Sequence, residues 1–329
     1  MALNRREFIK LSAATTAALS LGSVDLFADS RNGIPYRTLG KTGLEISLLS
    51  LGGHEIGVDH LTEKESIKIM RTAIDEGINF FDNAWEYHEG RSEERMGKAL
   101  VDGYREKVIL MTKHHGRDPK VAQQHLEDSL RRLRTEVIDV WQFHEIDEDW
   151  EIDSIYSSGV LDYVLKAKQE GKIKHIGFTG HFRPSMHLEM IHRGFDWETV
   201  QMPINILDKH FYSFTNNVLP VAVKKNIGVI AMKALAGPPG VIHKEGIAKA
   251  EEAYRFAMSM PVSTVCSGMD SFEYLQKNLK TVREFKPMTE EEINTLLAGV
   301  IKYSMNGEYE GYKTYTPGAP DDEEEEEEA

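Results

Sequence analysis

The sequence predicts a closed (β/α)₈ barrel, and three observations support this fold class. From about residue 36 onward, short apolar runs alternate with stretches of helical spacing, eight such runs occur, and no linker interrupts the series. The apolar runs lack clean alternation, which suits parallel strands that are covered on both faces. Eight strand–helix units in one series are typical of a barrel, which commonly takes a chain of this length as one domain.

An open, doubly wound sheet is the alternative architecture. It would normally place a Gly-x-Gly-x-x-Gly turn directly after its first strand. Residues 51–57 read Leu-Gly-Gly-His-Glu-Ile-Gly and do not match this pattern. The closed barrel is therefore favoured.

The strands come after a short hairpin. Two apolar runs flank the turn Gly40–Gly43, which predicts a β-hairpin that can cap the bottom of the barrel. In chain order, the predicted barrel strands are Ile46–Leu51, Asn79–Asn83, Val108–Lys113, Val137–His144, Lys174–Thr179, Thr199–Pro203, Gly228–Met232 and Ser263–Gly268.

Helical spacing of apolar residues fills the segments between these strands. The first helix opens with a Thr-x-x-Glu capping box at Thr62 and Glu65. Gly77 follows its last turn, where glycine permits the left-handed conformation that reverses the chain. The predicted helices are Thr62–Glu76, Glu93–Val101, Pro119–Leu133, Val160–Glu170, Pro184–Arg193, Phe214–Lys225, Lys244–Met260, Ser271–Val282 and Thr289–Tyr303.

The N-terminus does not fit the barrel pattern. Arg5 and Arg6 precede Phe8 and Lys10, and the uncharged apolar run Leu11–Val24 follows. This run is too short to span a membrane, and the whole segment resembles a twin-arginine export signal. We expect residues 1–30 to direct the chain through the twin-arginine export machinery to the periplasm. If the signal is not functional, the chain stays in the cytoplasm.

Charge and cysteine content exclude several kinds of site. The formal net charge is −14, and nucleic-acid binding instead needs a basic face. Cys266 is the only cysteine, so an internal disulfide and a cysteine-based metal centre are excluded. Residues 31–303 form the predicted barrel domain. Residues 304–329 form a predicted disordered tail, because the acidic run Asp321–Glu328 is too repulsive to pack.

Four polar residues follow three neighbouring strands, where a barrel places its active site. Asp82 lies near the end of the second strand and Tyr87 follows it, Lys113 ends the third, and His144 ends the fourth. A lysine beside the phenol is expected to lower its pKa from about 10, and a carboxylate keeps that lysine charged. The histidine can orient a substrate oxygen. This group can protonate an oxyanion while a hydride reaches carbon.

These residues lie in a longer motif. Residues 77–87 read Gly-Ile-Asn-Phe-Phe-Asp-x-Ala-x-x-Tyr, and Ser92-Glu93 and Gly97–Leu100 follow. The series resembles the signature of the aldo-keto reductase family, and the resemblance extends over about residues 36–279. It implies reduction of an aldehyde or ketone to an alcohol by a nicotinamide cofactor.

The resemblance assigns a role to each member of the tetrad. Tyr87 would be the proton donor, Lys113 and Asp82 would tune it, and His144 would orient the carbonyl. No metal is implied, and the sequence makes no prediction of oligomeric state.

The resemblance carries over less completely to the cofactor, NADP(H) or NAD(H). Thr179 replaces a family serine, and Gly180 replaces an asparagine whose role His181 can take. Met232 stands where the family has an aromatic residue that stacks on the nicotinamide, and a thioether can also pack on a ring. The implied cofactor-binding residues are Thr179, His181, Gln201, Met232, Lys233, Leu235, Gly237, Gly268, Met269 and Asn278.

The preference between the two cofactors stays open. Tyr274 occupies the position at which family members offer an arginine to the 2′-phosphate of NADPH. This weakens the expectation of a strong NADPH preference. Lys277 is close enough in sequence to substitute, so NADPH is not excluded.

The substrate pocket is expected to take a small carbonyl compound and to be lined by Trp85, His88, His54 and His115. Two other functions remain open. Several histidines near strand ends would suit a metal-dependent barrel hydrolase, although no His-x-His motif ends the first strand. A cofactor-binding regulatory subunit with slow turnover is the other alternative.

Overall fold

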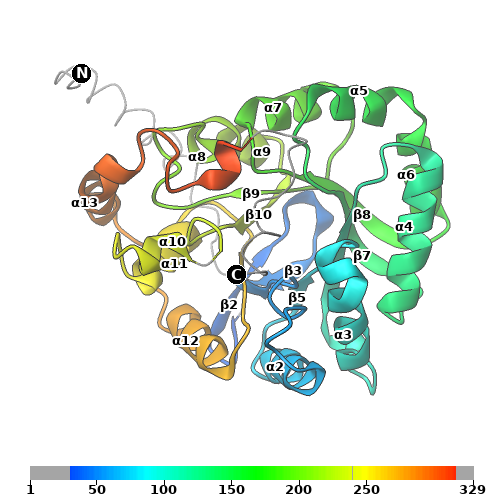
Figure 1. The fold of residues 1–329 in the computed structure, drawn as a ribbon, viewed down its shortest axis with the longest axis horizontal. Helices are drawn as coiled ribbons and strands as arrows, with labels where there is room; N and C mark the ends of the chain where they lie inside the picture. Colours follow the sequence, from blue (N-terminus) through cyan, green and yellow to red (C-terminus); the bar gives the residue numbers. More distant parts are fainter. Residues whose placement is uncertain (1–29, 239, 316–329) are drawn as a thin grey trace.

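A computed structural model describes residues 30–238 and 240–315, and its centre is a closed barrel of eight parallel strands (Figure 1). The predicted (β/α)₈ fold is confirmed. The strand order is β10-β11-β4-β5-β6-β7-β8-β9, and pairing of β9 with β10 closes the ring. The barrel strands are β4 (Leu49–Leu51), β5 (Phe80–Asp82), β6 (Ile109–His114), β7 (Ile138–Phe143), β8 (Ile173–Thr179), β9 (Thr199–Pro203), β10 (Gly228–Met232) and β11 (Thr264–Ser267).

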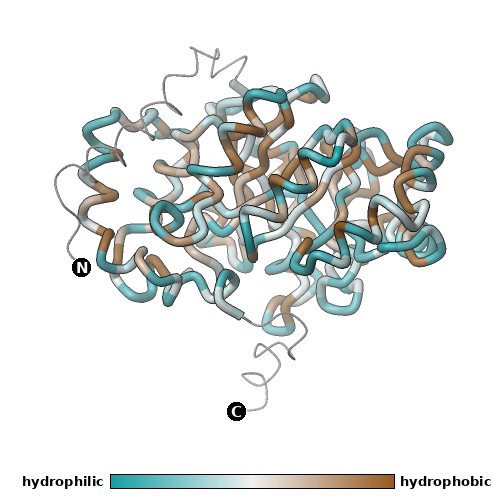
Figure 2. Tube along the Cα trace, turned by 90° about the horizontal axis from the view of Figure 1, so that it is seen from above, coloured by the Kyte–Doolittle hydropathy of each residue, from teal (hydrophilic) through white to brown (hydrophobic). Residues whose placement is uncertain are grey.

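Helices surround the barrel, and the outer turns are mostly hydrophilic while apolar segments run inside (Figures 1 and 2). The capping box at Thr62 and Glu65 forms as predicted. The helices are α2 (Glu63–Asp75), α3 (Arg91–Ala99), α4 (Pro119–Arg132), α5 (Asp149–Ser157), α6 (Val160–Gln169), α7 (Pro184–His192), α8 (Phe214–Asn217), α9 (Leu219–Lys224), α10 (Val241–Lys244), α11 (Ala250–Ser259), α12 (Phe272–Arg283) and α13 (Glu290–Val300).

The predicted helices were wrong in three places. Helix α5 was not predicted. The expected helix Phe214–Lys225 is divided into α8 and α9 at Val218, and Pro220 lies in the first turn of α9, where proline is tolerated. The expected helix Lys244–Met260 begins too early, because Lys244 is the last residue of α10, Gly246 has a φ of +64°, and α11 begins only at Ala250.

The N-terminal hairpin closes one end of the barrel, as predicted. Strands β2 (Ile34–Thr38) and β3 (Glu45–Ser47) pair antiparallel, and the short strand β1 (Ser30–Arg31) pairs with β2. At the turn, a Cβ added to Gly40 would lie 2.2 Å from the backbone nitrogen of Gly228, so only glycine allows this approach. Leu39 and Ile46 from the hairpin region share a buried cluster with the barrel residues Phe80, Met111, Val140 and Ile230.

The far end of the chain also packs against the barrel. The predicted tail begins at residue 304, but Ser304, Glu310 and Lys313 are buried. The Lys313 ammonium lies 2.6 Å from Asp208, in the loop after β9. This ion pair holds the segment in place, so the packed chain extends to Tyr315.

The predicted export signal and the run of acidic residues both lie outside the described residues. Within residues 30–238 and 240–315, no helix has the length and apolar character needed to cross a membrane.

Candidate active site

Three of the predicted catalytic side chains meet in hydrogen-bonding contact. Asp82 is the last residue of β5, and its carboxylate lies 2.6 Å from the Lys113 ammonium on β6. The same ammonium donates to the Tyr87 hydroxyl at 3.0 Å and to the backbone carbonyl of Asn83 at 2.8 Å. Lys113 is 1% exposed. Desolvation of such a charge is costly unless it is paired, and Asp82 provides the pairing.

Asp82 also connects strands across the barrel interior. Its second carboxylate oxygen accepts from the Gln201 side-chain amide on β9 at 2.7 Å and from the Cys266 thiol on β11 at 3.1 Å. Sequence reasoning placed Gln201 on the cofactor and gave Cys266 no role. Gln201 lies on β9, opposite β5 in the ring, and Cys266 lies on β11, two strands from β5, so their contact with Asp82 could be recognised only once the barrel order was known.

His144 follows β7 and lies beside the other three residues. Its ring is edge-on to the Tyr87 ring, with 5.6 Å between the centroids. Its Nδ1 lies 2.6 Å from the Glu86 carboxylate. Burial lowers the pKa of His144, and the neighbouring carboxylates of Glu86 and Glu145 only partly offset this effect. The Glu86 contact therefore fixes the orientation of the imidazole.

The predicted net lowering of the Tyr87 pKa does not occur. Burial, together with the charges of Asp82 and Glu86, raises the pKa of the Tyr87 phenol well above its ordinary value. Burial and the nearby carboxylates thus outweigh the effect of the Lys113 ammonium. The phenol is therefore protonated at neutral pH and can act as an acid.

Glu86 and Glu145 were missed by sequence reasoning. Glu86 precedes Tyr87 and also pairs with His115, while Glu145 lies 3.0 Å from His181. Burial would raise the pKa of Glu86, but the charges of its two histidines outweigh it and hold that pKa below the ordinary value. The same balance, with His144 and His181, lowers the pKa of Glu145.

The four predicted pocket residues do not all lie at the tetrad. His54 does, since its ring is edge-on to Tyr87 with centroids 5.2 Å apart. His88 lies next to His54 and is 2.9 Å from its backbone carbonyl. His115 lies at the tetrad as well, since its ring centroid is 5.0 Å from that of His144, and it also pairs with Glu86. Trp85 stacks on His125 of α4 at 3.7 Å, so its ring lies against that helix.

Comparison with known proteins identifies the family. The model of the aldo/keto reductase family matches residues 48–245. This chain belongs to the aldo/keto reductase family. It is an NAD(P)-dependent oxidoreductase. Membership of this family supports the reduction of carbonyl compounds as its general activity.

Relatives of known sequence and structure agree with this assignment. The uncharacterized oxidoreductase YrpG of Bacillus subtilis is 34% identical over 230 residues, covering 61% of this chain and 67% of that protein. L-galactose dehydrogenase of Arabidopsis thaliana is 28% identical over 295 residues, covering 78% and 90%. The holo aldo-keto reductase AKR11C1 of Bacillus halodurans, 24% identical, superposes with a TM-score of 0.70 over 84% of this chain and 99% of that one, which supports the fold.

In this aldo/keto reductase, the residues expected at the nicotinamide end are suited to an amide. Gln201 in the middle of β9 and Thr179 at the end of β8 are buried and pair with each other in the sheet, and His181 follows Thr179 in the chain. The Gln201 Oε1 atom is buried and has no hydrogen-bond partner among the described residues. A buried acceptor without a partner fits the N–H groups of a carboxamide.

The loop after β10 was expected to follow the cofactor. Met232 ends the strand half-buried, and Lys233 has a φ of +53°. The Lys233 ammonium lies 4.9 Å from the ring centroid of Tyr312, in the C-terminal segment. Gly237 also faces this ring, while Leu235 is partly buried nearby. The C-terminal segment thus covers this loop.

The residues expected at the adenosine end are already engaged. The Asn278 amide donates to the Ser267 hydroxyl at 2.9 Å, and the Met269 side chain is fully buried in the core. A Cβ added to Gly268 would lie 2.2 Å from the Glu55 carboxyl carbon. Glu55 therefore occupies the space beside Gly268, and its negative charge opposes a phosphate there.

Proposed function

We propose that this oxidoreductase reduces an aldehyde or ketone to an alcohol, with Tyr87 as the proton donor. The observation that carries this proposal is the chain of contacts from Asp82 to Lys113 to the Tyr87 hydroxyl, at 2.6 and 3.0 Å. A bound nicotinamide cofactor would supply the hydride that adds to the carbonyl carbon. The residues of the chain then have to deliver one proton to the carbonyl oxygen.

Tyr87 can make this transfer because its phenol is protonated at neutral pH and lies in direct contact with the Lys113 ammonium. As the carbonyl oxygen gains negative charge, it becomes the stronger base, and the Tyr87 proton moves to it. The phenolate that remains lies beside the Lys113 ammonium, which stabilises it. Asp82 holds Lys113 in place and does not give up a proton.

His144 would orient the carbonyl oxygen. Glu86 binds its Nδ1 side at 2.6 Å and so fixes the direction of the ring. Among residues 30–238 and 240–315, the Glu86 carboxylate is the only ion-pair partner of His144, which leaves the Nε2 side of the ring to the substrate. Such a group contributes by positioning the carbonyl next to Tyr87.

The side chains around Tyr87 favour a polar substrate. His54, His115, Glu86 and Glu145 offer several donors and acceptors, and each half-buried polar group gains from a hydrogen bond. We propose a carbonyl compound that carries hydroxyl groups. The relative L-galactose dehydrogenase is consistent with this class.

We propose either NADH or NADPH as the cofactor. Gln201 and Thr179 would hold the nicotinamide end, and Glu55 would have to turn away from Gly268 to admit the phosphates. Lys277, the cation expected to serve a 2′-phosphate, is paired with Glu273 at 2.7 Å. This pairing favours NADH.

Fluorescence titration with NADH and NADPH tests the proposed function, followed by cofactor oxidation with a panel of hydroxyaldehydes and ketones. We expect binding of at least one cofactor and turnover with some of the carbonyls. Tyr87→Phe should bind the cofactor normally and lose turnover. Failure of the wild-type protein to bind either cofactor would overturn the proposal.

We also propose export through the twin-arginine machinery, on the basis of Arg5 and Arg6. Such a route carries folded proteins, so the cofactor would bind before export. Changing both arginines to lysine should remove the protein from the periplasmic fraction. An unchanged periplasmic fraction would contradict export by this route.

A further inference from the structure

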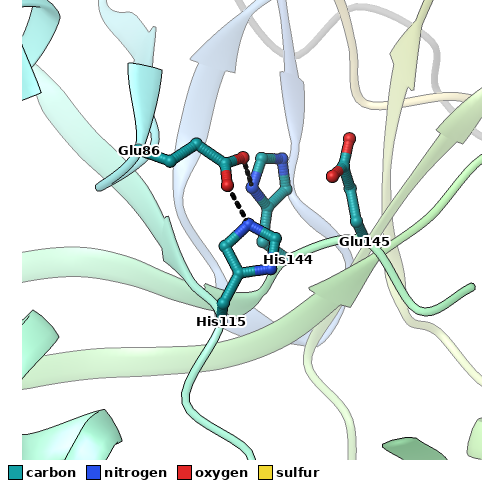
Figure 3. Close-up of side chains that lie close together, drawn as sticks. All are labelled: Glu86, His115, His144 and Glu145. Carbon is teal, nitrogen blue, oxygen red and sulfur yellow. Dashed lines mark ion pairs between the residues drawn. The ribbon is translucent and has the colours of Figure 1, made fainter. Parts of the chain in front are cut away.

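Four donor side chains, one of them His144 of the tetrad, converge at the ends of three adjacent strands (Figure 3). Glu86 follows β5, His115 follows β6, and His144 and Glu145 follow β7. Each offers one nitrogen or oxygen atom, and these atoms all lie within 4.8 Å of one another. Figure 3 shows the Glu86 carboxylate pointing at both imidazoles, with Glu145 on the opposite side.

The charges around this cluster are not balanced by lysine or arginine. Glu86 pairs with His115 and His144, and Glu145 pairs with His181. Among the residues that the structure describes, neither carboxylate forms an ion pair with a lysine or an arginine.

The nearby permanent cations already have their own partners. Lys113 is paired with Asp82 at 2.6 Å, and Arg117 is paired with Glu151 at 2.7 Å. The negative charges of Glu86 and Glu145 are therefore compensated only by imidazoles. Because burying an uncompensated charge is costly, this cluster favours binding of a positive ion.

We propose that Glu86, His115, His144 and Glu145 together bind one divalent transition-metal ion, with Zn²⁺ as the best match. Imidazole nitrogen and carboxylate oxygen are both common Zn²⁺ ligands, at about 2.0–2.2 Å. Ca²⁺ and Mg²⁺ instead prefer sites made of oxygen alone. Four donors suit the tetrahedral coordination of Zn²⁺, in which neighbouring donors lie about 3.4 Å apart. To reach this spacing, the Glu86–His144 pair has to open from 2.6 Å.

The surroundings support a built site with an open path to solvent. The Arg117 guanidinium donates to the backbone carbonyls of His144 and Glu145, the latter at 2.9 Å, and so fixes the loop that carries both ligands. The side chains of Glu86 and Glu145 are each 35% exposed, whereas that of His144 is 5% exposed. An ion can therefore enter from the rim and reach a buried imidazole.

This site does not depend on the proposed reduction. The ligand set excludes Tyr87, Lys113 and Asp82, and metal binding needs neither cofactor nor substrate. It replaces the sequence-based expectation that no metal is bound, and it does not make the protein a hydrolase. His144 belongs to both sites, so metal and carbonyl would meet at the same imidazole.

Equilibrium dialysis of the full-length protein against Zn²⁺, with elemental analysis, tests the inference. We expect one tightly bound Zn²⁺ per chain. His115→Asn and Glu86→Gln should each weaken binding by more than about 10-fold, a loss typical of disturbed metal sites. The matched control is His88→Asn, which removes a histidine of the same rim that is outside the ligand set.

Circular dichroism verifies that each variant is folded, and Glu145→Gln provides a third test if one variant fails to fold. Binding well below one Zn²⁺ per chain, or equal binding by wild type and both ligand variants, would overturn the inference. Tyr87→Phe separates it from the proposed function: this variant should lose carbonyl reduction and still bind Zn²⁺ like the wild type.

Discussion

Among residues 30–238 and 240–315, two lysines are buried, each near a tyrosine, and the two environments differ in what the tyrosine hydroxyl contacts. Lys113 is 1% exposed and donates directly to the Tyr87 hydroxyl at 3.0 Å. Lys313 is fully buried and is paired with Asp208 at 2.6 Å and with Glu310 at 3.0 Å. Here the tyrosine hydroxyl, that of Tyr312, donates to the Glu310 carboxylate at 2.5 Å.

This difference separates a reactive arrangement from a structural one. At Lys113, one carboxylate compensates the ammonium, and the hydroxyl next to it can lose its proton to a substrate and leave a stabilised phenolate. At Lys313, two carboxylates surround the ammonium, so a phenolate at Tyr312 would add a third negative charge. The same residue types therefore make a proton donor in one place and a clamp for the chain end in the other.

The largest expected effect is that of removing the reactive hydroxyl. Tyr87→Phe should lower kcat for carbonyl reduction by about 10²–10⁴-fold, the usual contribution of a positioned general acid. Tyr312→Phe is the matched control, because it deletes the hydroxyl of the structural pair, and it should retain most of the activity. Steady-state kinetics of both variants measures the difference. Equal losses would show that the two tyrosines are not functionally distinct.

For stability, the order of the two sites should be reversed: removing Lys313 should destabilise the protein more than removing Lys113. Lys313→Met leaves Asp208 and Glu310 buried without a cation and should lower the free energy of unfolding by about 3–5 kcal/mol. Lys113→Met leaves only Asp82, which keeps its bonds from Gln201 and Cys266, and should cost less stability but most of the activity. Urea unfolding measures both. A loss under about 1 kcal/mol for Lys313→Met would contradict its role as a clamp.

The reactive region could be predicted from the sequence more fully than the clamp. Asp82, Lys113 and His144 each come at or just after a strand end, so the barrel topology alone brings them to one rim. The clamp depends on contact between Lys313 and Asp208, which are far apart in the sequence, and residues 304–315 show no periodicity that would reveal it.

The direction in which a side chain points was the second feature that could not be predicted from the sequence. Glu86 and Glu145 flank predicted catalytic residues, but the sequence does not tell whether such neighbours point toward the site. Glu145 has a φ of +45°, an uncommon conformation outside glycine that no pattern announces. Trp85 shows the converse error, because a residue between Asp82 and Tyr87 turned out to face α4.

The dependence of activity on pH should reflect the raised pKa of Tyr87. Reduction needs the protonated phenol, and burial with nearby carboxylates moves the pKa above its ordinary value of about 10. A plot of kcat/KM for reduction against pH should therefore stay flat from neutral pH to about 10 and fall only above about 10, where the phenol loses its proton. Alcohol oxidation needs the phenolate and should rise over the same high range. Initial rates of reduction and of alcohol oxidation, measured across this pH range, test the prediction. It would be contradicted if kcat/KM for reduction fell with a midpoint between pH 7 and 9 in the wild type and this fall were absent in Tyr87→Phe.

The smallest expected effect concerns Glu55, whose carboxylate lies against Gly268. Glu55→Gln keeps the shape of the side chain and removes the charge that opposes the cofactor phosphates. The residues of the tetrad are not changed by this substitution. A single partly exposed charge contributes about 0.2–1 kcal/mol, so the Kd for NADH should fall by at most about 5-fold, with kcat unchanged. Fluorescence titration at low salt measures the shift, and Glu89→Gln, an exposed carboxylate near Tyr87, is the control. Weaker binding by Glu55→Gln would mean that this carboxylate holds the cofactor, by accepting a hydroxyl hydrogen bond, and does not repel it.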